Sequence, residues 1–140
     1  MRDHDALLAL LGERLNTPFA WASNDCCSFA FDCALAQTGH DAWADERGRY
    51  ATAIGAARVI RRYGGVQSIA DARFARIAPS MAMRGDLALV SSAAAGDAMS
   101  LAVVEGSTLV AVGVDGLVRL PRSAALAAWS IEQPANRSAR

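Results

Sequence analysis

Asn24-Asp25-Cys26-Cys27-Ser28-Phe29 opens a segment with helical periodicity that runs to about Gln37. Asn24 or Asp25 stands directly before the first apolar position, which is where N-cap residues occur. Cys26 then falls in the first helical turn, where free backbone N–H groups and the positive end of the helix dipole favour a thiolate. The pattern therefore makes Cys26 a nucleophile position, with Asp25 as the helix cap beside the sulfur. The alternative interpretation is an inert, buried cysteine.

Composition favours one domain over residues 1–132 and a flexible C-terminal tail over residues 133–140. The chain of 140 residues is 53% hydrophobic, which is enough for a core. Its 14 basic and 14 acidic residues cancel, which argues against a nucleic-acid partner or a charged membrane surface. We find no apolar run of about 18 residues for a membrane span and no signal peptide, so we expect synthesis in the cytoplasm.

The three cysteines lie between residues 26 and 33 and do not form a sensible disulfide framework. Cys26 and Cys33 share a helix face about 10 Å apart, which is too far for a bridge. A zinc site would need a fourth ligand and different spacing. We therefore expect no metal and no cofactor, and we interpret Cys27 and Cys33 as small core residues.

Periodicity predicts helices first and strands afterwards, which is typical of an α+β fold. Helical patterns cover residues 3–15, 26–37, 52–63 and 66–74, and strand patterns cover 87–90, 101–104, 108–112, 117–120 and 129–132. We expect the N-terminal helices, of which the one starting at Cys26 is buried, to pack on a small C-terminal antiparallel sheet. Leu7, Leu11, Phe29 and Val103 should share one core.

The tryptophans and arginines are the candidates for contact residues. Trp21 and Trp129 flank apolar segments and are predicted in the core, whereas Trp43 lies in a polar loop and is predicted at an interface. Eight of the arginines lie between Arg47 and Arg84. They form either a solvated helix face or a docking surface for an acidic partner.

Two motifs carry a resemblance to a known family. Asp25-Cys26, followed later by Arg84-Gly85-Asp86-Leu87-Ala88-Leu89-Val90, resembles the NlpC-type cell-wall peptidases and amidases, a branch of the papain-like cysteine hydrolases. Pro18-Phe19-Ala20-Trp21-Ala22-Ser23-Asn24-Asp25-Cys26 and Arg61-Arg62-Tyr63-Gly64-Gly65 resemble small proteins of phage and prophage tail gene clusters. The resemblance covers about residues 15–132 and implies an NlpC-like, papain-type fold.

Carried onto this chain, the resemblance leaves the catalytic set incomplete. Cys26 takes the nucleophile position, but Ser100 stands where the family has its histidine. The third polar position would fall near Ala111 or Val112. His40 lies beyond the far end of the Cys26 helix, and His4 lies in the first helix, so we expect both at the surface.

Three functional hypotheses remain. The first is a phage or prophage tail-tip or tail-assembly protein that has lost the catalytic histidine, contacts other tail proteins, is made in the bacterial cytoplasm and ends in the virion. The second is an active cysteine peptidase or amidase that cleaves peptidoglycan with Cys26 and an unusual base. The third is a module that binds a peptide or small molecule in the old cleft.

Overall fold

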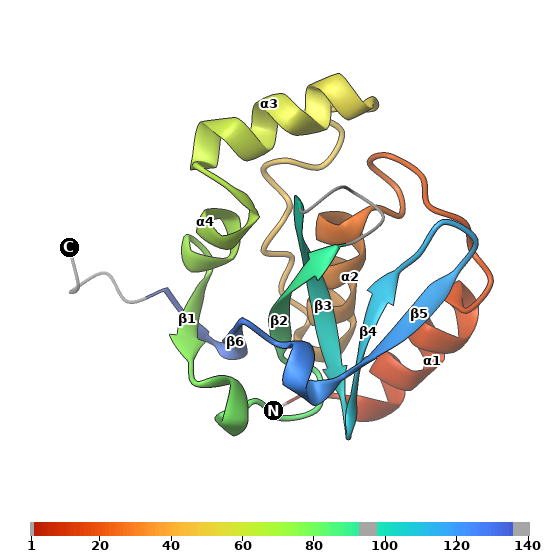
Figure 1. Ribbon diagram of the computed structural model, residues 1–140, viewed down its shortest axis with the longest axis vertical. Coiled ribbons are helices and arrows are strands. Elements are labelled where there is room, and N and C mark those ends of the chain that lie inside the picture. The colour runs from red at the N-terminus through yellow and green to blue at the C-terminus, as the bar shows by residue number, and fades with distance from the viewer. Residues whose placement is uncertain (1, 93–97, 136–140) are drawn as a thin grey trace.

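The computed structural model describes residues 2–92 and 98–135. Four helices come first along the chain, and six strands follow (Figure 1). The helices are α1 (His4–Arg14), α2 (Cys26–Thr38), α3 (Ala53–Tyr63) and α4 (Val66–Asp71). The strands are β1 (Phe74–Ile77), β2 (Leu87–Ser92), β3 (Ala98–Glu105), β4 (Thr108–Val112), β5 (Leu117–Pro121) and β6 (Ala127–Pro134), with short 3-10 turns η1 (Pro79–Met81) and η3 (Arg122–Ala124).

Helix α2 is the central helix, and its ends are set by local sequence. Asp25 accepts from the Ser28 N–H while the Ser28 hydroxyl accepts from the Asp25 N–H, which is a capping box. Gly39 ends the helix in the left-handed conformation with φ of 76°. Apolar side chains on more than one side of α2 are buried, because the helix packs on both β3 and α1.

The six strands form one antiparallel sheet in the order β1-β6-β2-β3-β4-β5. The larger core lies between α1, α2 and the sheet and includes Leu7, Leu11, Phe29 and Val103, as predicted. A second core covers the opposite sheet face, where Ala88, Ala102 and Ala128 leave room for the segments around η1 and η3. The α+β prediction is therefore confirmed: helices at the N-terminus, antiparallel sheet at the C-terminus.

Two element boundaries were predicted wrongly. The fourth helix ends at Asp71, and Phe74, predicted as its last residue, instead begins β1, which pairs with β6. Strand β6 continues to Pro134, so residues 133 and 134 belong to the sheet rather than to a tail. Residues 136–140 of the predicted tail, and residues 93–97 between the strand patterns at 87–90 and 101–104, lie outside the described part of the chain.

The tryptophan predictions held only for Trp129, which is fully buried. Trp43, predicted at an interface, is only 1% exposed and stacks on Phe31 with ring centroids 5.0 Å apart. Trp21, predicted in the core, is 41% exposed. The reason is tertiary: the loop that carries Trp43 folds over α2, whereas Trp21 lies on a turn that projects from the helix start.

Candidate functional site

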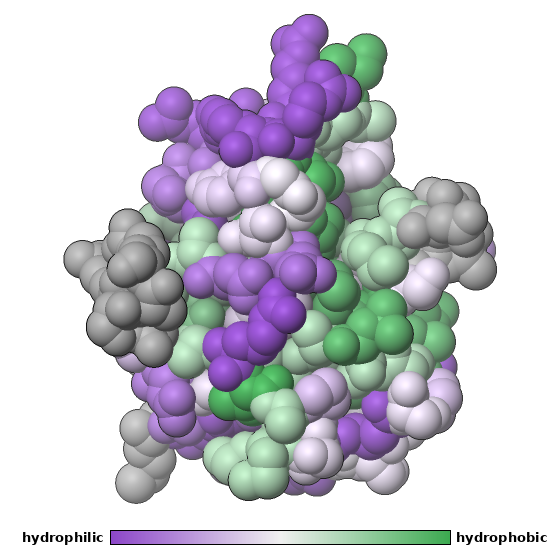
Figure 2. Space-filling view, turned by 60° about the vertical axis from the view of Figure 1, so that its left-hand side comes forward, coloured by the Kyte–Doolittle hydropathy of each residue, from purple (hydrophilic) through white to green (hydrophobic). Residues whose placement is uncertain are grey.

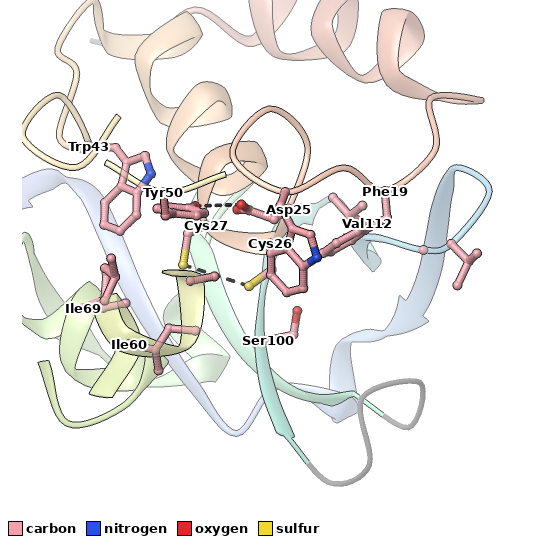
Figure 3. A pocket seen from close by; sticks show the side chains of 15 residues that line it. Phe19, Asp25, Cys26, Cys27, Trp43, Tyr50, Ile60, Ile69, Ser100 and Val112 are labelled. Atoms are coloured by element: carbon pink, nitrogen blue, oxygen red, sulfur yellow. Dashed lines mark hydrogen bonds between the residues drawn. The ribbon is translucent and has the colours of Figure 1, made fainter. Parts of the chain in front are cut away.

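A cavity of about 320 Å³ lies at the N-terminal end of α2 (Figure 3). Its walls come from the segment before α2, from α2 itself, from the loop after it, from α3 and α4, and from β3 and the β4–β5 turn. Most of the lining is apolar; the lining residues are Phe19, Trp21, Asp25, Cys26, Cys27, Trp43, Tyr50, Ala56, Val59, Ile60, Ile69, Ser100, Val112, Gly113 and Val114.

The turn before α2 is held in place by Asn24. Its amide donates to the carbonyl oxygens of Thr17 and Pro18, and its Oδ1 accepts from Arg14. Within this turn Ala22 has φ of 73°, a strained conformation for a residue with a side chain. The turn presents Phe19 and Trp21, which contact each other edge to face at 4.7 Å, at one side of the cavity.

Asp25 joins three segments at the cavity wall. Its Oδ1 accepts from the Ser28 N–H at 2.8 Å, and its Oδ2 accepts from the Ala22 N–H at 2.8 Å and from the Tyr50 hydroxyl at 2.7 Å. The carboxylate is 3% exposed. Burial and the Asp25 charge raise the pKa of Tyr50. The predicted role of Asp25 as helix cap is confirmed, and both carboxylate oxygens are engaged.

The Cys26 sulfur lies between Cys27 and Ser100 (Figure 3). The two cysteine sulfurs are 4.0 Å apart and share a weak S–H···S hydrogen bond. This contact, followed by the Leu101 N–H and the Ser100 hydroxyl, lowers the pKa of Cys26 to about 7, against the opposing effects of burial and of the Asp25 charge. Cys27 keeps its proton, because donation to Cys26 and burial raise its pKa well above the ordinary value.

The sequence analysis named Cys26, Ser100 and Asp25 as site residues, and all three line the cavity. Cys26 and Ser100 both line the cavity and interact, and Val112, at the third family position, lines it too. Asp25 is next to Cys26 in the chain, but its carboxylate oxygens accept hydrogen bonds from Ala22, Ser28 and Tyr50. His4 and His40 are exposed and neither lines the cavity. His40 follows the far end of α2, whose thirteen residues span roughly 20 Å.

Sequence reasoning missed three groups at the site. Cys27 was interpreted only as a core residue, although its adjacency to Cys26 was a signal for sulfur contact. Tyr50 and the Leu101 N–H are brought to the site by long-range packing, for which the local sequence carries no signal. Among the described residues, no group of three or more His, Cys, Asp or Glu side chains is arranged to hold a metal ion.

Comparison with known proteins places the chain in a family. A family model described as "Domain of unknown function (DUF6950)" matches residues 1–131, and the chain therefore belongs to this family. No curated protein and no solved structure matches it. Within the described residues, no helix has the length and apolar character needed to cross a membrane.

The pH dependence of Cys26 alkylation tests the sulfur cluster. Because its pKa is lowered to about 7, half of Cys26 is thiolate near pH 7, and the rate of reaction with iodoacetamide should reach half its maximum there. Cys27→Ala removes the largest lowering contact and should move the midpoint upward, toward an ordinary thiol near ~8.5. Cys33→Ala, distant from this contact, is the control and should leave it unchanged. A wild-type midpoint above about pH 8.5 would contradict this assignment.

The two aspartate caps allow a matched test of the Asp25 network. Asp25→Ala removes the cap of α2 and leaves the Ala22 N–H and Tyr50 hydroxyl without an acceptor, so unfolding free energy should fall by about 2–4 kcal/mol. Asp3→Ala removes only the exposed cap of α1, which accepts from the Ala6 N–H, and should cost about 1 kcal/mol. Urea denaturation measures both; equal losses would show that the buried network adds nothing.

Proposed function

We propose that this DUF6950 member is a non-hydrolytic protein of NlpC-like fold that works through its surfaces in assembling the tail, or tail tip, of a phage or prophage. The observation that carries the proposal is the absence of an imidazole beside the Cys26 sulfur. Ser100, at the position where the resembling hydrolases have an imidazole, lines the cavity with Cys26, and neither histidine does.

The missing imidazole matters because amide hydrolysis needs a proton carrier. A cysteine hydrolase needs a group that takes a proton and then delivers one to the leaving amine. A serine hydroxyl does neither near neutral pH, and Asp25 is occupied by three donors. Hydrolases that lose one member of a catalytic triad retain only a small fraction of their catalytic rate. Efficient cleavage of peptidoglycan peptides is therefore not expected.

Fold and motif support the remaining parts of the proposal. A helix that begins at a cysteine and packs on an antiparallel strand carrying the histidine position is the arrangement that the NlpC resemblance implies. The motif shared with phage tail proteins, Pro18–Cys26, forms the turn before α2 and one side of the cavity. Its residues thus have structural roles that do not require catalysis.

The surface proposed for contact with other tail proteins is the outer face of α3, which we call the arginine face and define as Arg58, Arg61 and Arg62. All three are exposed, and hydrophilic side chains gather at this end of the molecule (Figure 2). Arg62 also bonds to Glu46. An acidic surface on a neighbouring protein would complement it. The edge strands β1 and β5 are a second place where a partner strand could add.

Charge reversal of the arginine face tests the assembly role. In the phage or prophage that encodes the protein, deletion of its gene should abolish normal tails, and the wild-type gene should restore them. Arg58→Glu with Arg61→Glu should restore at least tenfold fewer tailed particles, counted by electron microscopy. Arg84→Glu changes another exposed arginine, in the turn before β2; it is the control and should restore them fully. Normal tails in the absence of the gene would overturn the proposal.

A second candidate function is peptidoglycan hydrolysis, and the lowered pKa of Cys26 is the observation that favours it. The two candidates differ in a direct assay. Purified protein incubated with peptidoglycan should release no more peptide fragments than Cys26→Ala, measured by chromatography and mass spectrometry. Release by the wild type that Cys26→Ala abolishes would establish the hydrolase and refute the non-hydrolytic assignment.

A further inference from the structure

The cavity beside Cys26 is not used by the proposed assembly surfaces. Arg58, Arg61 and Arg62 point away from it, whereas the same helix turns Ala56, Val59 and Ile60 into its lining. A volume of about 320 Å³ lies at the small end of the range of ligand sites, which starts near ~300 Å³. The cavity therefore offers a binding function in addition to the assembly role, and an inference from it goes beyond that role.

The cavity has a closed end and an open end, with the sulfur between them. Trp43, Ile60 and Ile69 lie on the Cys27 side of Cys26, and Phe19 and Val112 lie on the other side (Figure 3). Trp43 and Ile69 are fully buried, whereas Phe19 and Trp21 are more than a third exposed. A ligand that enters past the two exposed aromatic rings thus meets Cys26 halfway and places its far end among buried apolar side chains.

The lining suits a hydrocarbon chain better than a peptide. A peptide backbone carries a donor and an acceptor at each residue, and each needs a partner when buried. The few polar side chains of the lining are Asp25, Tyr50 and Ser100 with the cysteines, and Asp25 and Tyr50 are bonded to each other. A methylene chain needs no such partners and gains about 0.8 kcal/mol for each buried CH₂.

We propose that the cavity binds the hydrocarbon chain of an acyl thioester and that Cys26 accepts its acyl group. The Cys26 thiolate attacks the thioester carbonyl carbon, so that a new S–C bond forms. The bond from that carbon to the original sulfur breaks, and its electron pair leaves with the departing thiolate. The products are an acyl-Cys26 thioester and a free thiol; nothing is oxidised or reduced.

Thioester exchange is a reaction that a site with a thiolate and hydrogen-bond donors, but without an imidazole, can carry out. A thiolate leaves without a proton, so the reaction needs no acid, whereas an amine leaving group does. The Leu101 N–H and the Ser100 hydroxyl, which both lower the pKa of Cys26, are the donors next to the sulfur that can stabilise the charge developing on the carbonyl oxygen. Since no imidazole lines the cavity to activate water, the acyl group stays on Cys26.

Acyl transfer from defined thioesters tests this inference. The full-length protein is incubated with octanoyl-coenzyme A or acetyl-coenzyme A, and intact mass with fragmentation locates the acyl group. Both rates are divided by those of N-acetylcysteine, which corrects for intrinsic reactivity. Octanoyl transfer to Cys26 should be at least tenfold faster than acetyl transfer, persist for hours, be reversed by hydroxylamine and be absent in Cys26→Ala. The same assay with octanoyl-acyl carrier protein, compared with octanoyl-coenzyme A, shows which of these two thioesters is the better donor of the chain.

A variant that fills the cavity separates binding of the chain from reactivity of the sulfur. Ala56→Phe places a ring in the cavity lining and should abolish the preference for octanoyl over acetyl. Ala57→Phe, on the exposed side of the same helix, is the matched control and should leave both normalised transfer rates within about twofold of the wild type. Iodoacetamide alkylation of Cys26 reports that both variants are folded. Equal normalised rates for both chains in the wild type, or acylation at Cys27 or Cys33 instead, would overturn the inference. Rapid loss of the acyl group with repeated turnover would also overturn it, in favour of a hydrolase.

Discussion

The buried carboxylate of Asp25 is the constraint on which the site depends. One oxygen accepts from α2 through the Ser28 N–H, and the other accepts from the preceding turn through the Ala22 N–H and from the following loop through the Tyr50 hydroxyl. A buried carboxylate without such donors would be very unfavourable, so these three segments must meet. Their meeting point is the wall of the cavity, and it fixes where Cys26 lies. The strained φ of Ala22 is compensated by the hydrogen bond that its own N–H makes here.

The same carboxylate explains why the sulfur needs several donors. Its negative charge disfavours a thiolate on the next residue, and so does burial. Cys27, Leu101 and Ser100 together outweigh both effects. The result is a nucleophile that owes its reactivity to fixed hydrogen-bond donors rather than to a base. Such a site can attack an electrophile whose leaving group needs no proton, but it has no group to move protons through a hydrolytic cycle.

Local sequence signals predicted the parts of the fold that local interactions determine. The caps at Asp3 and Asp25 and the glycine after α2 follow from side chains within a few residues. The buried position of Trp43 does not, because it depends on Arg73, thirty residues later. The Arg73 guanidinium lies 4.8 Å from the Trp43 ring centroid and donates to the Ala42 carbonyl oxygen. These contacts hold the loop that carries Trp43 against α2, although most of its residues are polar. Strand β1 was missed for a similar reason: four residues suffice only because β6 pairs with them.

The loop that Arg73 pins also connects the cavity to the proposed contact surface. Glu46 in this loop accepts from Arg62 on the arginine face and from the Tyr63 hydroxyl, and Tyr63 in turn accepts from Arg73. Helix α3 therefore carries exposed arginines on one face and cavity wall on the other, and its outer charge is tied to the loop that bears Trp43 and Tyr50. A ligand that fills the cavity contacts the inner face of α3 and therefore stabilises the folded protein by mass action.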